Sequence, residues 1–380
     1  MDYIPRAISD SFTKRLQGKK VLVLLGARRV GKTEFIKEYL KNIQPDEMLL
    51  LNGDDAQHVE LMREQSVTNY KRFLSGKSYL IIDEAQRIPE IGSKLKLIVD
   101  HFDKLKIVAT GSSVFDLSNK LGEPLVGRKN TVMLYPLAQM ELAKTEDFLE
   151  TKARLEERLI FGSYPELLQY DNWDEKRVYL NGILNDYLLR DILGFEGIRR
   201  SGKILDLLRL IAFQIGKEVS IQELGKQLQM SKTTVERYLD LLTKVFVLYK
   251  LPGFSRNLRK EISKSQRWYF HDVGIRNAVI NNFNHLNLRN DVGELWENYL
   301  IAERIKYQQY SNRFVRNYFW RTYDQQELDW VEEEYGELRA FEFKWQQKRK
   351  VKIPPAWVKT YPDTQHKIIH PDNYLEWIGG

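Results

Sequence analysis

The chain of 380 residues contains no cysteine. This absence excludes disulfide bonds, zinc sites built from thiolates and cysteine nucleophiles. The first residues carry no signal-peptide pattern, and no apolar run approaches the length that would cross a membrane. We therefore expect a cytoplasmic protein that has no membrane partner, in agreement with the reducing conditions that a cysteine-free chain tolerates.

The chain also has few histidines, and its excess of one charge sign is small. His366 and His370 lie four residues apart in a strand-like segment, and the surrounding sequence lacks a helical zinc motif. The 59 basic and 52 acidic residues leave a formal net charge of +7, a modest excess that fits an acidic partner without requiring one. Hydrophobic residues make up 43% of the chain, which is enough for packed cores, and the length predicts two or three domains.

The sequence does contain one complete motif. Residues 26–33 read Gly-Ala-Arg-Arg-Val-Gly-Lys-Thr and directly follow the apolar run Val21–Leu25. This pattern predicts a phosphate-binding loop between a buried strand and a helix, where backbone amides contact phosphate oxygens. Lys32 is expected to contact the β- and γ-phosphates of ATP, and the Thr33 hydroxyl to ligate Mg²⁺. The predicted nucleotide-contacting residues are Gly26, Ala27, Arg28, Arg29, Val30, Gly31, Lys32, Thr33 and Glu34.

A second nucleotide motif is the apolar strand Tyr79–Ile82, which is followed by Asp83 and Glu84. Asp83 is expected to hold Mg²⁺ through its water shell. Glu84 is the expected general base for the attacking water. An acidic pair after a strand is usually only a solvated strand end, so the prediction depends on the phosphate-binding loop as well.

Three further polar residues are candidate members of the nucleotide site, two of them as sensors of the γ-phosphate. Thr110 ends the expected strand Lys106–Thr110, and Ser112 follows two residues later, so the sequence does not choose between them. Arg128 is a candidate arginine finger, acting in cis or on a neighbouring subunit. An ordinary turn or surface role stays open for each of the three.

Short apolar strands alternate with helical segments through the first part of the chain. This alternation predicts an α/β fold of the P-loop NTPase type, with a parallel sheet covered by helices on both faces. The expected strands are Val21–Leu25, Met48–Leu51, Tyr79–Ile82 and Lys106–Thr110.

Residues 203–270 have the pattern of a winged helix. Two expected helices, Gln222–Leu228 and Lys232–Val245, precede strand-like segments on either side of a basic loop, and the aromatic run Trp268–Phe270 is most simply core. DNA binding and protein docking are both open functions for such a region. The possible DNA contacts are Lys232, Thr233, Thr234, Arg237, Arg256, Arg259 and Lys260.

The C-terminal third contains a second group of acidic residues. Glu297 lies on an expected helix, Asp329 on a strand, and Glu342 and Lys344 on the same face of the next strand. The three carboxylates could hold a divalent cation, and Lys344 could stabilise a phosphorane-like transition state. This pattern resembles the acidic pair and E-x-K tail of the restriction-endonuclease-like fold, which cuts phosphodiesters. A binding platform without cleavage is the alternative.

The order of the motifs resembles a prokaryotic family of AAA-type ATPases with a C-terminal domain of uncharacterised function. The segments that carry the resemblance are residues 26–33, 81–86, 109–113, 125–128, 135–137 and 162–166. It implies four regions: an ATPase core at 1–136, a helical appendage at 137–202, a winged helix at 203–275 and a restriction-endonuclease-like domain at 288–380.

These features together predict a Mg²⁺-dependent ATPase that acts as a nucleotide-driven switch or motor on DNA, as a homo-oligomer. A nucleotide-gated platform for protein or DNA, with an inactive nuclease-like domain, is the main alternative. An ATP-regulated nuclease is a third hypothesis. The expected cofactors are ATP and Mg²⁺, and the C-terminal region is a possible docking site for a protein partner.

Overall fold

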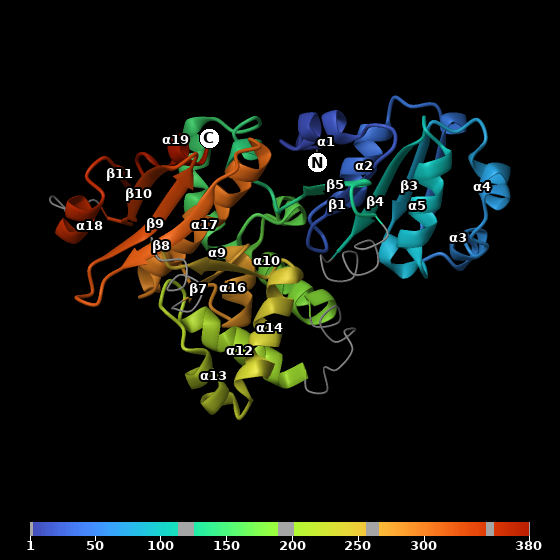
Figure 1. Ribbon diagram of the computed structural model, residues 1–380. Coiled ribbons are helices and arrows are strands. Elements are labelled where there is room, and N and C mark those ends of the chain that lie inside the picture. The colour runs from blue at the N-terminus through green and yellow to red at the C-terminus, as the bar shows by residue number, and fades with distance from the viewer. Residues whose placement is uncertain (1–2, 113–124, 189–200, 256–265, 347–352, 380) are drawn as a thin grey trace. The chain divides into compact units, whose positions relative to one another are not determined.

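The computed structural model describes residues 3–112, 125–188, 201–255, 266–346 and 353–379 (Figure 1). The chain divides into two compact units. Residues 5–136 and the short segment 244–246 form one unit, and nearly all of the chain from Leu137 onward belongs to the other. Within the described ranges, every helix is too short or too polar to cross a bilayer.

The first unit is built on a five-stranded sheet in which every pair of neighbours is parallel. Its spatial order is β2-β3-β4-β1-β5, so β1 lies between two strands that come much later in the sequence. The strands are β1 (Val21–Leu25), β2 (Met48–Asn52), β3 (Tyr79–Asp83), β4 (Lys106–Gly111) and β5 (Lys129–Met133). This sheet confirms the predicted α/β fold of the P-loop NTPase type.

Helices connect these strands. They are α1 (Ser9–Arg15), α2 (Lys32–Leu40), α3 (Ala56–Leu61), α4 (Val67–Leu74) and α5 (Ile91–His101), with 3₁₀ turns at Pro45–Glu47 and Ala85–Arg87. All five residues of β1 are buried, which explains why this strand is a continuous apolar run and not an alternating one. The carboxyl ends of β1, β3 and β4 therefore lie at one edge of a rigid sheet, where ligands of open α/β sheets bind.

The second unit begins with helices. They are α7 (Gln139–Leu142), α8 (Phe148–Ala153), α9 (Leu155–Phe161), α10 (Trp173–Gly182), α12 (Ser201–Phe213), α13 (Ile221–Leu228) and α14 (Lys232–Lys244), with a 3₁₀ turn at Pro165–Gln169 and a π-helical segment at Ile183–Leu188. An antiparallel pair follows, β6 (Leu248–Pro252) and β7 (Gln266–Phe270). Helices and strands thus occur where the sequence predicts a winged helix, and that fold assignment stays a prediction.

The rest of this unit contains a four-stranded sheet in the order β11-β10-β9-β8. Its pairs are antiparallel except β10 with β11. The strands are β8 (Arg316–Arg321), β9 (Glu327–Glu334), β10 (Glu337–Phe343) and β11 (Gln365–Ile369), and the helices are α16 (Val273–Val279), α17 (Val292–Tyr310), α18 (Pro355–Thr360) and α19 (Tyr374–Ile378), with a 3₁₀ turn at Leu286–Leu288.

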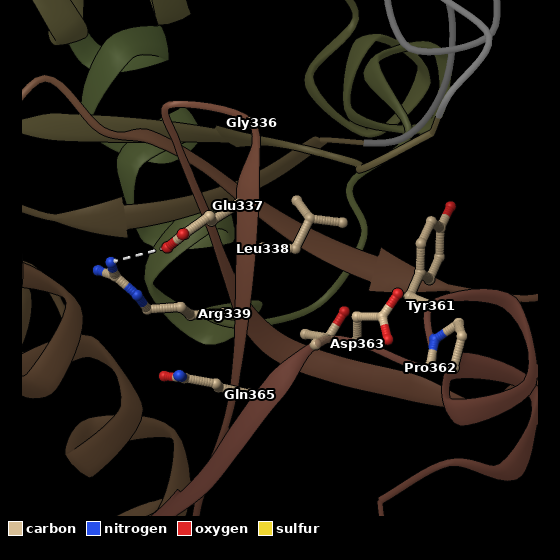
Figure 2. A pocket seen from close by; sticks show the side chains of 9 residues that line it. Gly336, Glu337, Leu338, Arg339, Tyr361, Pro362, Asp363 and Gln365 are labelled. Atoms are coloured by element: carbon tan, nitrogen blue, oxygen red, sulfur yellow. Dashed lines mark ion pairs between the residues drawn. The ribbon is translucent and has the colours of Figure 1, made fainter.

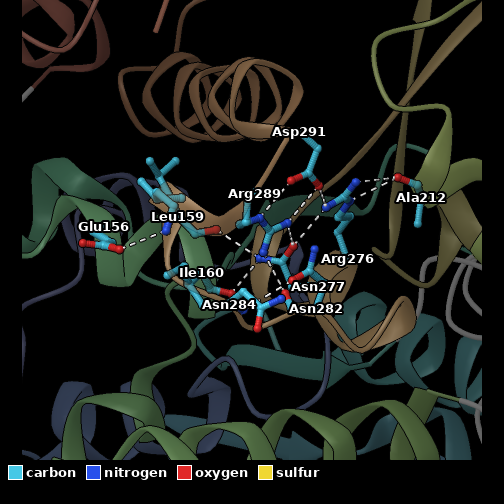
Figure 3. Close-up of polar contacts among 11 residues, drawn as sticks. Glu156, Leu159, Ile160, Ala212, Arg276, Asn277, Asn282, Asn284, Arg289 and Asp291 are labelled. Carbon is cyan, nitrogen blue, oxygen red and sulfur yellow. Dashed lines mark hydrogen bonds and ion pairs between the residues drawn. The ribbon is translucent and has the colours of Figure 1, made fainter.

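A buried polar network joins the helical part of this unit to the start of α17 (Figure 3). Arg276 on α16 donates to the carbonyl oxygen of Ala212 at 2.9 and 3.1 Å and pairs with Asp291 at 2.5 Å. Arg289 contacts the same Asp291 carboxylate at 2.8 and 2.9 Å. Asp291 is partly buried, but the two arginines lower the pKa of its carboxyl to about 2. These pairs fix α12 and α16 to the segment that leads into α17.

Candidate functional site

The loop between β1 and α2 has two positions that require glycine. Gly31 has a φ of +93°, in the left-handed region that other residues resist. A Cβ at Gly26 would lie 2.1 Å from the carbonyl oxygen of Leu134, so the loop passes directly over the backbone that follows β5. Because α2 begins at Lys32, the first amides of this helix are adjacent to the loop.

The Lys32 side chain is buried and folds back over this loop. Its Nζ atom donates to the carbonyl oxygens of Gly26 and Ala27 at 2.8 and 3.0 Å. The ammonium group is therefore inside the turn, where an anion bound by the loop would meet it.

Thr33 and Asp83 come from different motifs and contact each other. The Thr33 hydroxyl donates to Asp83 Oδ2 at 2.9 Å, and the hydroxyl of Thr110 donates to Asp83 Oδ1. A hydroxyl and a carboxylate are the hard oxygen donors that Mg²⁺ prefers, and both stand at the carboxyl edge of the sheet beside Lys32. The residues thus fit the magnesium ion that the motifs imply.

The backbone of Glu84 adopts a conformation that is uncommon for residues other than glycine. Its φ of +48° places it in the left-handed region, and its amide lies 3.2 Å from Asp83 Oδ1 and from the Thr110 hydroxyl. Gln86, which sequence reasoning gave no role, donates to the Glu84 carboxylate at 2.5 Å and lies 3.5 Å from the Ser112 hydroxyl. Of the two predicted sensors, Thr110 contacts the Asp83 carboxylate and Ser112 lies beside Gln86.

Arg6 is a second residue that sequence reasoning missed. Its guanidinium donates to the carbonyl oxygens of Val30 at 2.8 Å and Tyr135 at 2.6 Å, and the side chain is buried. Arg6 thus ties the phosphate-binding loop to the segment after β5. Nothing in the local sequence could have indicated this contact, because Tyr135 is 129 positions away.

The other predicted residues of the loop have varied surroundings. Val30 is buried, Arg28 is half-buried, Arg29 is exposed with a φ of +65°, and Glu34 is exposed and pairs with Lys37 at 2.7 Å.

Arg128 lies at the amino ends of the strands, on the side of the sheet opposite the phosphate-binding loop. Its carbonyl oxygen accepts a hydrogen bond from the amide of Val21, the first residue of β1, and its guanidinium pairs with Asp100 at 2.7 Å. The phosphate-binding loop follows the other end of β1, roughly 16 Å away at the rise of a parallel strand. Arg128 is thus distant from the phosphate-binding loop of its own chain, and its role as an arginine finger stays a prediction.

The residues predicted for the C-terminal site do converge, and two residues of β7 join them. We call Arg267, Tyr269, Glu297, Glu327, Asp329, Glu342 and Lys344 the C-terminal cluster. The Tyr269 hydroxyl donates to Glu297 at 2.5 Å, and Lys344 donates to Glu342 at 2.6 Å, so the predicted shared face of Glu342 and Lys344 is confirmed. Asp329 accepts from the backbone amide of Phe343 at 2.8 Å.

Burial changes the protonation of this cluster. Burial and the neighbouring Asp329 raise the pKa of Glu297 to about 8 and that of Glu342 to about 7. Burial also raises the pKa of Asp329. Burial would lower the pKa of Lys344, but its hydrogen bond to Glu342 raises it above the ordinary value. At neutral pH, part of the acidic cluster therefore carries protons.

The resemblance to nucleases implies a divalent metal at this cluster, and the side chains do not fit one as they stand. In the described part of the chain, no three acidic, histidine or cysteine side chains are arranged to hold a metal ion. Arg267 lies between the carboxylates, 3.9 Å from Glu297 and 4.0 Å from Asp329. The convergence predicted from sequence is thus present without a metal-ligand geometry.

The possible DNA contacts are only partly described. On α14, Lys232, Thr233 and Arg237 are exposed and Thr234 is half-buried, whereas Val235 and Leu239 on the opposite stripe are buried. Arg256, Arg259 and Lys260 lie outside the described residues.

A polar surface pocket of about 420 Å³ lies at the start of β10 (Figure 2). It is lined by residues 336–339 and 361–365. Arg339 in its wall pairs with Glu337 at 3.6 Å. Glu342 and Lys344 follow at the other end of the strand, so the pocket contains none of the predicted site residues.

Comparisons with known proteins agree with the fold of the first unit. Residues 18–143 match the model of an AAA domain, and residues 152–286 and 292–373 match two domains of unknown function, DUF8612 and DUF4143. The uncharacterized protein Rv2008c of Mycobacterium tuberculosis is 27% identical over 339 residues, covering 87% of this chain and 71% of that protein. An uncharacterized protein of Haemophilus influenzae is 24% identical and covers 68% of this chain and 69% of its own length.

Among solved structures, a signal transduction ATPase with numerous domains from Pyrococcus horikoshii covers 82% of this chain and 48% of its own. The TM-score is 0.31 and the sequence identity 12%. The first unit thus matches the model of an AAA domain over residues 18–143, in agreement with its P-loop NTPase fold.

Proposed function

We propose that this protein hydrolyses ATP with Mg²⁺ and uses the reaction as a switch or motor on DNA, as a homo-oligomer. The observation that carries the ATPase part of the proposal is the contact between Thr33 and Asp83 at 2.9 Å. It joins the two motifs that would ligate the metal, immediately beside the lysine of the phosphate-binding loop.

In this proposal each side chain has a separate task. Lys32 and the loop amides bind the β- and γ-phosphates, and Thr33 and Asp83 hold the metal. When bound, Mg²⁺ neutralises charge that develops on the phosphate oxygens. Thr110 orients the Asp83 carboxylate, and Glu84 takes the proton from the attacking water while Gln86 restrains its carboxylate. The left-handed backbone at Glu84 supports this role, since strained residues tend to occur at active sites.

Phosphate release with Mg²⁺ and ATP tests the assignment. We expect Lys32→Ala to abolish hydrolysis because the phosphates lose their cation, and Glu84→Gln to abolish hydrolysis while the nucleotide stays bound. Lys41→Ala is the matched control, because Lys41 is an exposed lysine at the end of the same helix and pairs only with Glu38 among the contacts described. Hydrolysis that is unchanged in both site variants would refute the proposal.

The DNA part of the proposal is supported by the exposed face of α14. Lys232 and Arg237 are positive and exposed on the side opposite the buried stripe. Phosphate contacts of this kind predict a DNA affinity that falls steeply with salt. We expect Lys232→Ala with Arg237→Ala to weaken DNA binding and reduce its salt dependence. Binding that is equal to wild type at every salt concentration would remove α14 from the DNA site.

Two other functions concern the C-terminal cluster. A nucleotide-gated platform without chemistry is favoured by the lack of a metal-ligand geometry, and an ATP-regulated nuclease is favoured by the convergence of Asp329, Glu342 and Lys344. A nicking assay with Mg²⁺ or Mn²⁺ separates them. Cleavage that Asp329→Ala and Lys344→Ala both abolish would establish the nuclease, and no cleavage of any DNA structure would favour the platform.

A further inference from the structure

Arg267 reaches the C-terminal cluster from outside the segment that carries the acidic residues. It lies on β7, within the segment that matches DUF8612, whereas the carboxylates belong to the segment that matches DUF4143. Side chains two positions apart on a strand share a face, so Arg267 and Tyr269 both point toward Glu297 on α17. The C-terminal cluster therefore combines residues from both matched segments.

The position of Arg267 is fixed by its surroundings. Its side chain is 3% exposed, its guanidinium lies 4.5 Å from the ring centre of Phe319, and it pairs with Glu327 at 2.7 Å. Three residues further along β7, Asn298 of α17 donates to the carbonyl oxygen of Phe270 and accepts from its amide, both at 2.8 Å. These bonds fix β7 against α17, and this contact holds Arg267 in the C-terminal cluster.

The guanidinium lies near two of the carboxylates that a metal would need as ligands. Its Nη1 atom lies 3.9 Å from Glu297 and 4.0 Å from Asp329, so it stands between carboxylates from α17 and β9. A divalent cation would require those oxygens at about 2.0 to 2.6 Å from its own centre, closer than the guanidinium nitrogen lies to either of them. On another side, a Cβ at Gly216 would lie 3.0 Å from both Glu297 oxygens, so backbone closes the cluster there.

The remaining charge is also satisfied by groups of the chain itself. Lys344 pairs with Glu342 at 2.6 Å, and the raised pKa values of Glu297 and Glu342 mean that protons remove part of the negative charge at neutral pH. A cluster with its own cations and protons has little electrostatic demand for a further cation.

We propose that Arg267 is the built-in cation of the C-terminal cluster, and that it stands in the place of a divalent metal and keeps metal ions out. The cluster therefore joins the two matched segments electrostatically in the way that a structural metal would. This inference does not depend on ATP hydrolysis by the first unit.

Binding of Mn²⁺ to the full-length protein tests the inference, with the electron paramagnetic resonance signal of the free ion as the measurement. Wild type and Asp329→Asn should bind Mn²⁺ equally, because the cluster takes no metal. Arg267→Met, which removes the cation and keeps a side chain of similar length, should gain a site and raise the Mn²⁺ affinity at least about tenfold. Adding Asp329→Asn to that variant should abolish the gain.

Arg267→Lys is the matched control, because it keeps a positive charge and should bind no more Mn²⁺ than wild type. A folded Arg267→Met variant that gains no site would overturn the proposal. If that variant does not fold, the comparison of wild type with Asp329→Asn decides alone. Mn²⁺ binding to wild type that Asp329→Asn removes would show that the cluster accepts metal despite the arginine, whereas equal binding supports the proposal.

Discussion

Asp83 and Asp329 are both strand carboxylates in sites that the sequence associates with a metal ion, but their neighbours differ in kind. Asp83 accepts hydrogen bonds from the hydroxyls of Thr33 and Thr110. Asp329 lies 4.0 Å from the Arg267 guanidinium and accepts a backbone amide. A hydroxyl oxygen keeps lone pairs that ligate a cation once its proton turns away, whereas a guanidinium has only donors.

This difference shows why a group of acidic residues is not by itself a metal site. The Asp83 site can receive a cation without losing any residue, because its present partners are themselves potential ligands. The C-terminal cluster would have to expel a buried arginine first, and an uncompensated buried charge is costly. The identity of the partners, and not the count of carboxylates, therefore favours Asp83 over Asp329 as the ligand of the proposed metal ion.

The largest expected effect that separates the two sites is that of a matched pair of substitutions on ATP hydrolysis. Asp83→Asn should lower the rate of phosphate release about 100-fold or more, the usual scale for losing one group that stabilises transition-state charge. Asp329→Asn should leave the rate within about twofold, since it changes no residue of the nucleotide site. A steady-state assay with Mg²⁺ and ATP checks both. Equal losses in the two variants would contradict the assignment of the metal to Asp83 alone.

A smaller effect is expected at Gln86, which contacts the predicted base and not the nucleotide. Gln86→Ala should lower kcat about tenfold with KM nearly unchanged, because a carboxylate without its restraint is correctly placed less often. Gln57→Ala, an exposed glutamine of the same unit, is the control and should have wild-type kinetics. A rise in KM at constant kcat would instead indicate that Gln86 binds the nucleotide.

The fold of the first unit could be predicted because its strands and its phosphate-binding loop are each marked by a contiguous stretch of sequence. Buried parallel strands are continuous apolar runs, so the expected strand Met48–Leu51 differs from β2 by one residue, and the phosphate-binding loop is contiguous in sequence. Arg6 was not predictable, since its two acceptors are brought together only by the fold. The position of Arg128 required the parallel register of β5 with β1, which the sequence does not state.

Only Lys344 and some of the acidic residues of the C-terminal cluster could be predicted from the sequence. Alternation along β10 placed Glu342 and Lys344 on one face, and that expectation is confirmed. Tyr269 belongs to the run Trp268–Phe270 that we expected to be core, and Arg267 directly precedes this run. Tyr269 is indeed fully buried, but its hydroxyl and the arginine face α17. Which element packs against a strand is a tertiary fact, so the partner that changes the chemistry of the cluster was not visible in the sequence.

The smallest expected effect concerns the pH dependence of stability in the second unit. The folded state raises the pKa of Glu297 from the ordinary 4.5 to about 8, so between these values the folded chain binds more protons than the unfolded chain. The contribution of Glu297 to stability should therefore be greatest at low pH and be lost as the pH rises to about 8. Burial lowers the pKa of His271 to about 4, and this acts in the opposite direction up to about pH 6.5. The range from pH 6.5 to 8.5 isolates the carboxyls.

In that range, wild type should lose stability as pH rises, by at most about 1.4 kcal/mol per pH unit for a single carboxyl. Glu297→Gln keeps an oxygen that accepts the Tyr269 hydroxyl and has no proton to lose, so its slope should be flatter. Tryptophan fluorescence during urea unfolding measures both, and Trp296 is adjacent to the substituted residue. Mn²⁺ should not change the wild-type slope, because the charge that appears on Glu297 meets Arg267 and not a metal. A slope that Mn²⁺ removes would make the C-terminal cluster behave like the Asp83 site, and the distinction between the two sites would be lost.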